Sequence, residues 1–304
     1  MQTFIPLTSK PMIALSLSAK VFMFILLLSN NVSSAIPSDW NHGCTRSYDE
    51  DGKMAWDMPH LATKGDLLLL FLSRTDDVLP LKIKGWRHAA SCFKSGNGQK
   101  QCWTKKDCLN KKNGYCTEFP NGKGRDLATI VFFKPWNEND PSTFKYDLPG
   151  NQHAGWGFLL AVNGLADHYK PIRDKNTSSR DESVHSIFPS VNGREGDLIL
   201  FSMAFDDKAE DTDFRPPNGT DLVNFVNGRD EAGFLYSKEL TTNNATGELV
   251  TRGPGGPENK DVLISLVLKS SSSSNIDSSI SSISNRNSSI SSIEDERFRI
   301  GLAH

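Results

Sequence analysis

The sequence predicts an all-β fold, a two-sheet antiparallel β-sandwich over about residues 40–269. Its apolar residues come in short runs that are rich in β-branched and aromatic side chains, and clusters of Gly, Pro, Asn and Asp separate the runs. No window of helical length in this region carries a sustained apolar stripe, so we expect no helix longer than a turn. The clearest expected strands are 67–73, 128–134, 156–162, 198–205, 233–238 and 262–269.

The expected strands follow the same order twice along the chain. Gly65-Asp66 opens one strand and Gly196-Asp197 opens its counterpart, and a loop glycine, Gly85 or Gly219, comes later in each half. Strands 128–134 and 232–238 then match, and a closing strand follows each, 156–162 and 262–269. This pattern predicts an internal two-fold repeat. The alternative is a Greek-key sandwich that reuses one turn-and-strand pattern without duplication.

Both ends of the chain are expected to lie outside the fold. Lys10 and Lys20 precede the apolar run 21–28, and small residues at Ser33 and Ala35 predict a signal peptide, 1–35, with cleavage after Ala35. The apolar run is too short to span a membrane, so we expect a secreted, extracellular protein without a membrane span. A bipartite organelle signal is the alternative. The serine-rich residues 270–304 are predicted to be disordered, which leaves 36–269 for the sandwich.

Four of the five cysteines lie in a short insert, residues 92–116, and Cys44 stands apart. Their spacing is wider than in zinc fingers, and an oxidising compartment favours disulfides. We expect two disulfides within the insert, with the pairing open and Cys44 free or paired externally. The four insert cysteines are Cys92, Cys102, Cys108 and Cys116.

Acceptor triplets for N-glycosylation occur four times, and in a secreted chain they predict glycans in exposed loops. The acceptor residues are Asn176, Asn218, Asn244 and Asn287.

The formal net charge of −2 argues against a nucleic-acid-binding protein, but the charge is unevenly spread. Residues 92–124 carry seven lysines against Asp107 and Glu118. We interpret the insert as a lysine-rich knob that presents Trp103 and Tyr115 to an acidic polymer or partner. The alternative is that its disulfides only staple a long loop without a core of its own.

Two acidic pairs follow expected strands and are candidate Ca²⁺ ligands, because this cation prefers carboxylate oxygens. The pairs are Asp76-Asp77 and Asp206-Asp207. The alternative is solvated turns, which aspartates also form. No other cofactor is expected.

The order of these motifs resembles a known group of proteins. A Gly-Asp-Leu strand opening, Gly85-Trp86, a strand ending in Lys134 and then Gly155-Trp156-Gly157 resemble jelly-roll modules of phage tail-associated and bacterial surface proteins, which have a concanavalin-like shape. The resemblance covers about residues 62–269 and implies a jelly-roll-like sandwich, with no catalytic residues to transfer. The sequence departs from it in the insert and in a long connection, 163–191.

The chain contains no motif for nucleophilic, metal-assisted or phosphate-binding catalysis. Aromatic side chains near loops can stack on sugars, and Trp86, Trp103, Tyr115 and Trp136 are the candidates, whereas Trp156 is expected in the core. Trp136 is expected to be exposed. We therefore predict a non-catalytic binding protein for an extracellular glycan or cell-surface component. The alternatives are a structural cell-wall or coat glycoprotein and a carbohydrate-active hydrolase or lyase.

Overall fold

The structure is a computed structural model. It describes residues 42–49, 53–60, 62–74, 79–95, 102, 104–112, 115–118, 125–147, 155–181, 185–205, 215–227, 231–252 and 260–271, all within one unit of the chain, Ser34–His304. The expected signal peptide and nearly all of the expected disordered tail lie outside these ranges. No helix in the described part of the chain is long and apolar enough to cross a membrane.

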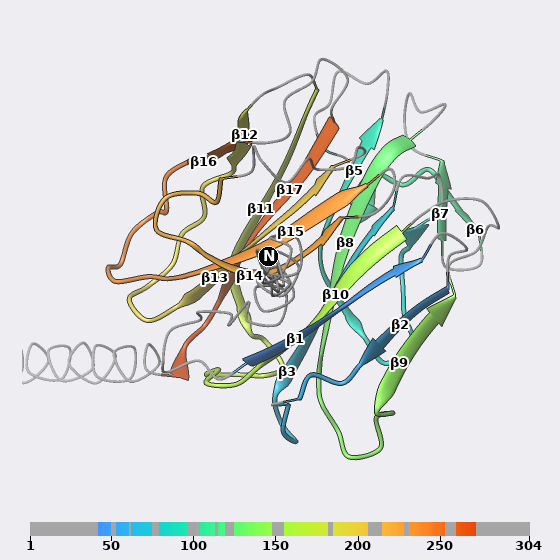
Figure 1. Ribbon diagram of the computed structural model, residues 1–304, viewed down its shortest axis with the longest axis horizontal. Coiled ribbons are helices and arrows are strands. Elements are labelled where there is room, and N and C mark those ends of the chain that lie inside the picture. The colour runs from blue at the N-terminus through green and yellow to red at the C-terminus, as the bar shows by residue number, and fades with distance from the viewer. Residues whose placement is uncertain are drawn as a thin grey trace, which may run out of the picture. The chain divides into compact units, whose positions relative to one another are not determined.

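The prediction of an all-β fold is confirmed by two antiparallel five-stranded sheets (Figure 1). The first sheet has the strand order β1 (His42–Asp49), β10 (Gly155–Val162), β3 (Leu67–Arg74), β8 (Arg125–Pro135) and β5 (Arg87–Ser95). The second has the order β11 (Ile172–Asp181), β17 (Lys260–Leu268), β13 (Leu198–Phe205), β15 (Ala232–Glu239) and β14 (Asp221–Asn227).

The two sheets are the two halves of the chain, and their strands follow the same order. Each half adds a two-stranded ladder at the same point of the sequence: β2 (Lys53–Asp57) with β9 (Thr143–Asp147), and β12 (His185–Phe188) with β16 (Leu249–Arg252). The predicted repeat is therefore present in the topology. The strands β11 and β12 lie in the stretch 163–191, which the sequence had indicated as a long connection; that interpretation is wrong.

Alternate side chains of the central strands enter different cores. Leu67 and Leu69 of β3 share one buried cluster with Leu198 of β13, so the two sheets pack face to face. The other faces are also buried, by Trp56 of β2 in the first half and by Phe188 of β12 in the second. Because both faces of β3 and β13 are covered, their sequences are continuous apolar runs.

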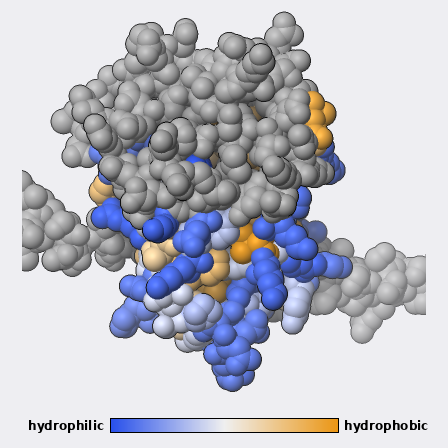
Figure 2. Space-filling model, turned by 90° about the vertical axis from the view of Figure 1, so that its right-hand side faces the viewer, coloured by the Kyte–Doolittle hydropathy of each residue, from blue (hydrophilic) through white to orange (hydrophobic). Residues whose placement is uncertain are grey.

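The outer ladders give the sandwich four layers, two more than the sequence predicts (Figure 1). Strand β2 alternates exposed and buried residues, with Met54 and Trp56 pointing inward. The face of the molecule that carries β2 and β9 is accordingly mainly hydrophilic, with small hydrophobic areas between the polar side chains (Figure 2).

The repeated Gly-Asp motif forms the same turn in both halves. Gly65 and Gly196 have φ angles of +94° and +81°, a region in which glycine avoids the steric cost of a side chain. The carboxylate of Asp66 accepts a hydrogen bond from the Thr63 amide at 2.7 Å, and that of Asp197 accepts one from Arg194 at 2.8 Å. The motif therefore has a structural role, the closure of a tight turn before the central strand.

The insert separates β5 from β8 in the first half. It contains the three-residue 3-10 helix η1 (Lys105–Asp107), β6 (Asn110–Lys112) and β7 (Tyr115–Glu118), and β7 pairs with β4 (Leu79–Pro80). In the second half, only residues 228–231 separate β14 from β15. The insert is thus the main departure from the repeat.

Candidate functional site

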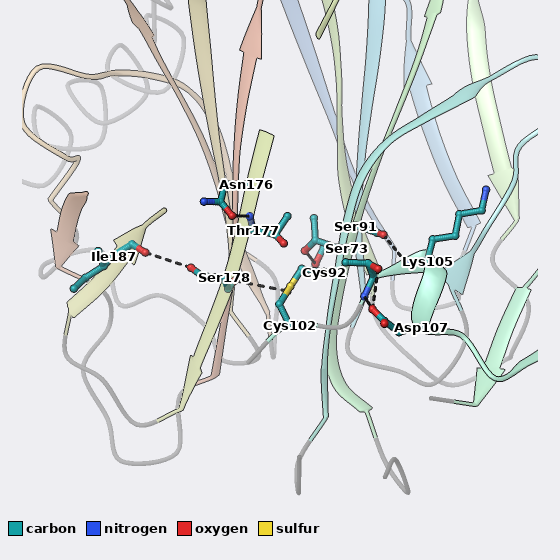
Figure 3. The surroundings of a disulfide bond; sticks show 12 residues. Ser73, Ser91, Cys92, Cys102, Lys105, Asp107, Asn176, Thr177, Ser178 and Ile187 are labelled. Carbon is teal, nitrogen blue, oxygen red and sulfur yellow. Dashed lines mark hydrogen bonds between the residues drawn. A yellow bond between two sulfur atoms is a disulfide. The ribbon is translucent and has the colours of Figure 1, made fainter. Parts of the chain in front are cut away.

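A pocket of about 550 Å³ lies at the junction of the two halves, where β5 of the first sheet packs against β11 of the second. Figure 3 shows Asn176 and Thr177 of β11 on one side of this region, with Ser91 and Lys105 on the other. Residues from β5, β11 and the start of the insert form its wall. They are His88, Ala90, Ser91, Thr104, Lys105, Lys106, Lys175, Asn176 and Thr177.

A disulfide and a set of hydrogen bonds fix the part of the wall that the insert contributes (Figure 3). Cys92 of β5 is bonded to Cys102, with their Cα atoms 5.2 Å apart. The Lys105 amide donates to the Ser91 hydroxyl at 3.1 Å. The Asp107 carboxylate accepts from the amide and the hydroxyl of Thr104, at 2.7 and 2.8 Å. These bonds hold η1 against β5, so this wall of the pocket is preformed.

The pocket concentrates positive charge. The nine lining residues that the structure describes include three lysines and one histidine, and none of the nine is an aspartate or glutamate. Burial, followed by the charges of Lys105 and Lys175, lowers the pKa of His88 to about 4, so its imidazole is neutral at pH 7. Partial burial and the charge of Lys106 lower the pKa of Lys175. The positive charges of two chain segments therefore converge on one cavity.

The neutral groups of the pocket are hydrogen-bonding side chains. His88 Nε2 lies 3.1 Å from the Ser91 hydroxyl, and the Asn176 amide donates to the Ser190 carbonyl at 3.0 Å. A serine beside a histidine is a nucleophile-base pair in many enzymes, but Ser91 is only 3% exposed and already accepts from the Lys105 amide. The arrangement suits recognition of a ligand better than attack on one.

The second half of the chain has an equivalent junction, where β14 packs against β1. The strand registers place Phe225 at the position of Ser91, and both strands have a register shift at the same point. Arg46 of β1 crosses this junction: its guanidinium donates to the Phe225 carbonyl at 2.6 Å and lies 5.2 Å from the centre of the Phe225 ring. The small residues Ala90 and Ser91 thus line the junction that has the pocket, whereas the junction of β14 with β1 has the aromatic ring of Phe225 at the equivalent position.

Two of the four predicted ligand-binding aromatic residues, Trp86 and Trp136, are not among the residues that line this pocket. Trp86 is 8% exposed and packs in a core with Phe144, at 5.3 Å between ring centres, which favours a packing role over sugar stacking. Trp136 is half-buried against the same core, and the expectation that it is exposed is wrong. Its position matches Leu240, since each backbone amide donates to the turn carbonyl, of Asp66 or Asp197. Trp103 and the side chain of Tyr115 lie outside the described residues.

The cysteines follow the prediction as far as the structure describes them. Cys92 and Cys102 form a disulfide within the insert, Cys108 is also disulfide-bonded, and the side chain of Cys116 lies outside the described residues. Cys44 is free and half-buried, and burial raises the pKa of its thiol to about 12. Its thiolate is therefore scarce at neutral pH. Trp156 is fully buried, as expected.

The remaining predicted sites are only partly within the described ranges. Asp76, Asp77, Asp206 and Asp207 all lie outside them, and the described residues contain no group of three or more His, Cys, Asp or Glu that could hold a metal ion. Asn218 and Asn244 are exposed in turns or bends. Asn176 is exposed on β11, whereas Asn287 lies outside the described residues.

Sequence reasoning identified only one wall of the pocket, the lysine-rich insert. It assigned no role to Lys175 and interpreted its surroundings as a connection. His88 is one of seven histidines scattered along the chain, and no motif marks it as a pocket residue. The signal that could have located Lys175 is the repeat itself, because β1 and β11 open the two halves in equivalent positions.

Comparisons with known proteins add no assignment. No family model and no curated protein matches the chain. Among solved structures, the STIV MCP aligns over 76% of this chain and 96% of its own at 6% identity, with a TM-score of 0.19. The major capsid protein P2 from bacteriophage PM2 aligns over 76% and 97% at 10% identity, with a TM-score of 0.16. Likenesses this weak carry no argument, and the resemblance to phage tail-associated and bacterial surface modules stays a prediction.

Proposed function

We propose that this chain is a secreted, non-catalytic binding protein for an extracellular glycan or another cell-surface component, and that the pocket between β5 and β11 is its binding site. The observation that supports this most is the preformed wall of hydroxyl, amide and ammonium groups around a cavity of about 550 Å³. Sites for small ligands have volumes of this order and a few fixed polar groups that orient the ligand.

The predicted alternatives differ in what they require. A glycoside hydrolase normally needs two carboxylic acids that face each other across the substrate, and the lining residues within the described part of the chain provide none. A structural wall or coat glycoprotein needs no ligand pocket, so a preformed cationic cavity favours a binding role.

A glycan array on the mature protein tests the proposal. We expect saturable binding that falls when Lys106 and Lys175 are both changed to Gln. The matched control changes Lys53 and Lys145, two exposed lysines of the β2–β9 ladder, to Gln and leaves binding unchanged. Release of reducing ends from a bound glycan would establish the enzyme. Binding to no glycan, together with sedimentation with washed cell walls, would establish the structural role.

The proposed secretion has its own test. The protein recovered from the medium of expressing eukaryotic cells should begin at Ile36, because the small residues at Ser33 and Ala35 mark the expected cleavage site. Retention of the full chain inside the cells would contradict it.

A further inference from the structure

We infer that the pocket between β5 and β11 recognises an oxyanion, the sulfate ester or carboxylate of an acidic sugar. The inference rests on the proposed glycan-binding function and names the chemical group that makes a glycan a ligand. Four features of the site support it: its charge, the origin of that charge, the energetic cost of the charge without a ligand, and the donors around it.

The charge of the pocket does not follow from the charge of the protein. The chain as a whole has a formal net charge of −2, but among the nine described lining residues three are lysines and none is acidic. Lys105 and Lys106 come from the insert, and Lys175 comes from β11 in the other half. Two segments far apart in the sequence therefore bring cations to the same cavity, and this local field attracts anions.

The lysines of the pocket are held near one another by contacts that fix their segments. The Lys105 amide is bonded to Ser91, and the Lys175 ammonium donates to the carbonyl of Ala89 on β5. The charges of Lys106 and Lys175 act against one another, and burial, followed by the charges of Lys105 and Lys175, keeps His88 unprotonated. An anion in the pocket would relieve this repulsion, so its binding is favoured over that of a neutral sugar.

The neutral donors complement the lysines. The hydroxyl of Thr177 and the imidazole of His88 are among the lining groups. His88 stays neutral, because burial, followed by the charges of Lys105 and Lys175, lowers its pKa to about 4, and the charged donors of the site are the lysine ammonium groups. Charge-assisted bonds to sulfate or carboxylate are about twice as strong as bonds between neutral groups, and this difference allows discrimination.

Isothermal titration with matched oligosaccharides tests the inference. The probes are κ-carrageenan oligosaccharides and the same oligosaccharides after desulfation, and oligogalacturonates and their methyl esters. We expect the full mature protein to bind at least one acidic probe about tenfold or more tightly than its neutral partner. Binding of the carrageenan alone identifies sulfate as the recognised group, and binding of the galacturonate alone identifies the carboxylate.

The variants locate the binding site. Lys106→Gln with Lys175→Gln should weaken binding of the acidic probe about tenfold or more, and Lys53→Gln with Lys145→Gln should leave it unchanged. Equal binding of acidic and neutral probes would overturn the inference and leave the proposed function intact. An unchanged affinity in the pocket variant, or tighter binding of duplex DNA than of either acidic probe, would also overturn it. Absence of binding to every glycan would reject both the inference and the proposed function.

Discussion

The junction of β5 with β11 and the junction of β14 with β1 occupy equivalent places in the two halves of the molecule. At the junction of β14 with β1, Arg46 lies over the ring of Phe225, and the Asn224 amide is 3.4 Å from the Cys44 carbonyl. At the junction of β5 with β11, Ser91 takes the position that is equivalent to Phe225, and a pocket is present. The backbone frame is shared, so the difference between the junctions lies in a few side chains and in the insert.

The same comparison separates structural from functional parts of the sequence. Features that occur in both halves, such as the Gly-Asp turns and the apolar central strands, maintain the frame. Features of one half alone are the insert, its disulfides and the lysines beside it. We attribute ligand binding to this second set, in line with the tendency of function to lie on loops that a rigid scaffold positions.

The largest expected effect concerns a glycine that the second half lacks. Gly157 takes the position of Leu263, and a Cβ atom on Gly157 would lie 2.5 Å from the Phe71 carbonyl oxygen and 2.6 Å from the Trp56 ring. Gly157→Ala should therefore lower the free energy of unfolding by about 3 kcal/mol, measured by urea denaturation. Ala55→Gly, at an exposed strand position, should cost no more than about 1 kcal/mol. Equal losses in the two variants would show that the site is not sterically closed.

The next effect tests the disulfide that only the first half has. Cys92 takes the position of Val226, so the second half builds the same strand without a bond there. Cys92→Ala with Cys102→Ala should cost about 2–3 kcal/mol of stability, because the unfolded chain loses a constraint. It should also weaken glycan binding, since η1 is freed from β5. Cys44→Ala serves as the control, and full binding by the variant that lacks Cys92 and Cys102 would contradict the preformed wall.

A smaller loss of stability is expected from a change at the junction of β14 with β1. Arg46→Ala removes a hydrogen bond and a cation-π contact with Phe225, and we expect a loss of about 1 kcal/mol in stability. Glycan binding should not change, because this junction takes no part in it. Arg46→Lys should lose less stability than Arg46→Ala, since the lysine ammonium keeps the charge but lacks the planar guanidinium group. A fall in glycan affinity would show that both junctions bind ligand.

The smallest expected effect is the contribution of His88 to the pH dependence of the free energy of unfolding. Its pKa is lowered to about 4 in the folded protein, so between pH 6.5 and 4 the unfolded chain binds the extra proton. The free energy of unfolding therefore keeps its full value above pH 6.5 and decreases as the pH falls from 6.5 towards 4. His88→Gln should reduce this loss by about 1 kcal/mol, since the ring is partly exposed to screening solvent.

The charged groups that act on His88 are Lys105 of η1 and Lys175 of β11. Urea midpoints at pH 7 and pH 4.5 give the comparison, and the exposed His60→Gln provides the control. An identical pH dependence in the wild type and the His88 variant would contradict the assignment.

The sequence predicts the frame better than the site for a physical reason. Central strands such as β3 are buried on both faces, so their apolar runs are visible in the sequence, and the repeated Gly-Asp turns mark where they begin. Edge strand β11 has the sequence Ile-Arg-Asp-Lys-Asn-Thr-Ser-Ser-Arg-Asp, which lacks such a run, and it resembled a loop. Its pairing with β17 comes from tertiary structure, and with it the place of Lys175.

The expectation that Trp136 is exposed was wrong for a related reason. Trp86 and Trp136 stand beside Gly, Pro and Asn, which favours exposure when only neighbours in the sequence are considered. Both instead pack against the outer core that the β2–β9 ladder closes, and nothing in the local pattern marks that ladder. By contrast, residue types and spacing alone predicted disulfides within the insert, because a short insert with four cysteines has few ways to be stable, but they left the pairing open.

Hydrogen-deuterium exchange with and without bound κ-carrageenan or galacturonate oligosaccharide tests the central claim most directly. We expect the acidic oligosaccharide to slow exchange at the amides of 88–91, 104–107 and 175–177 and to leave exchange at 44–46 and 222–226 unchanged. Protection of the junction between β14 and β1, or of the β2–β9 ladder, without protection of the first set would contradict it.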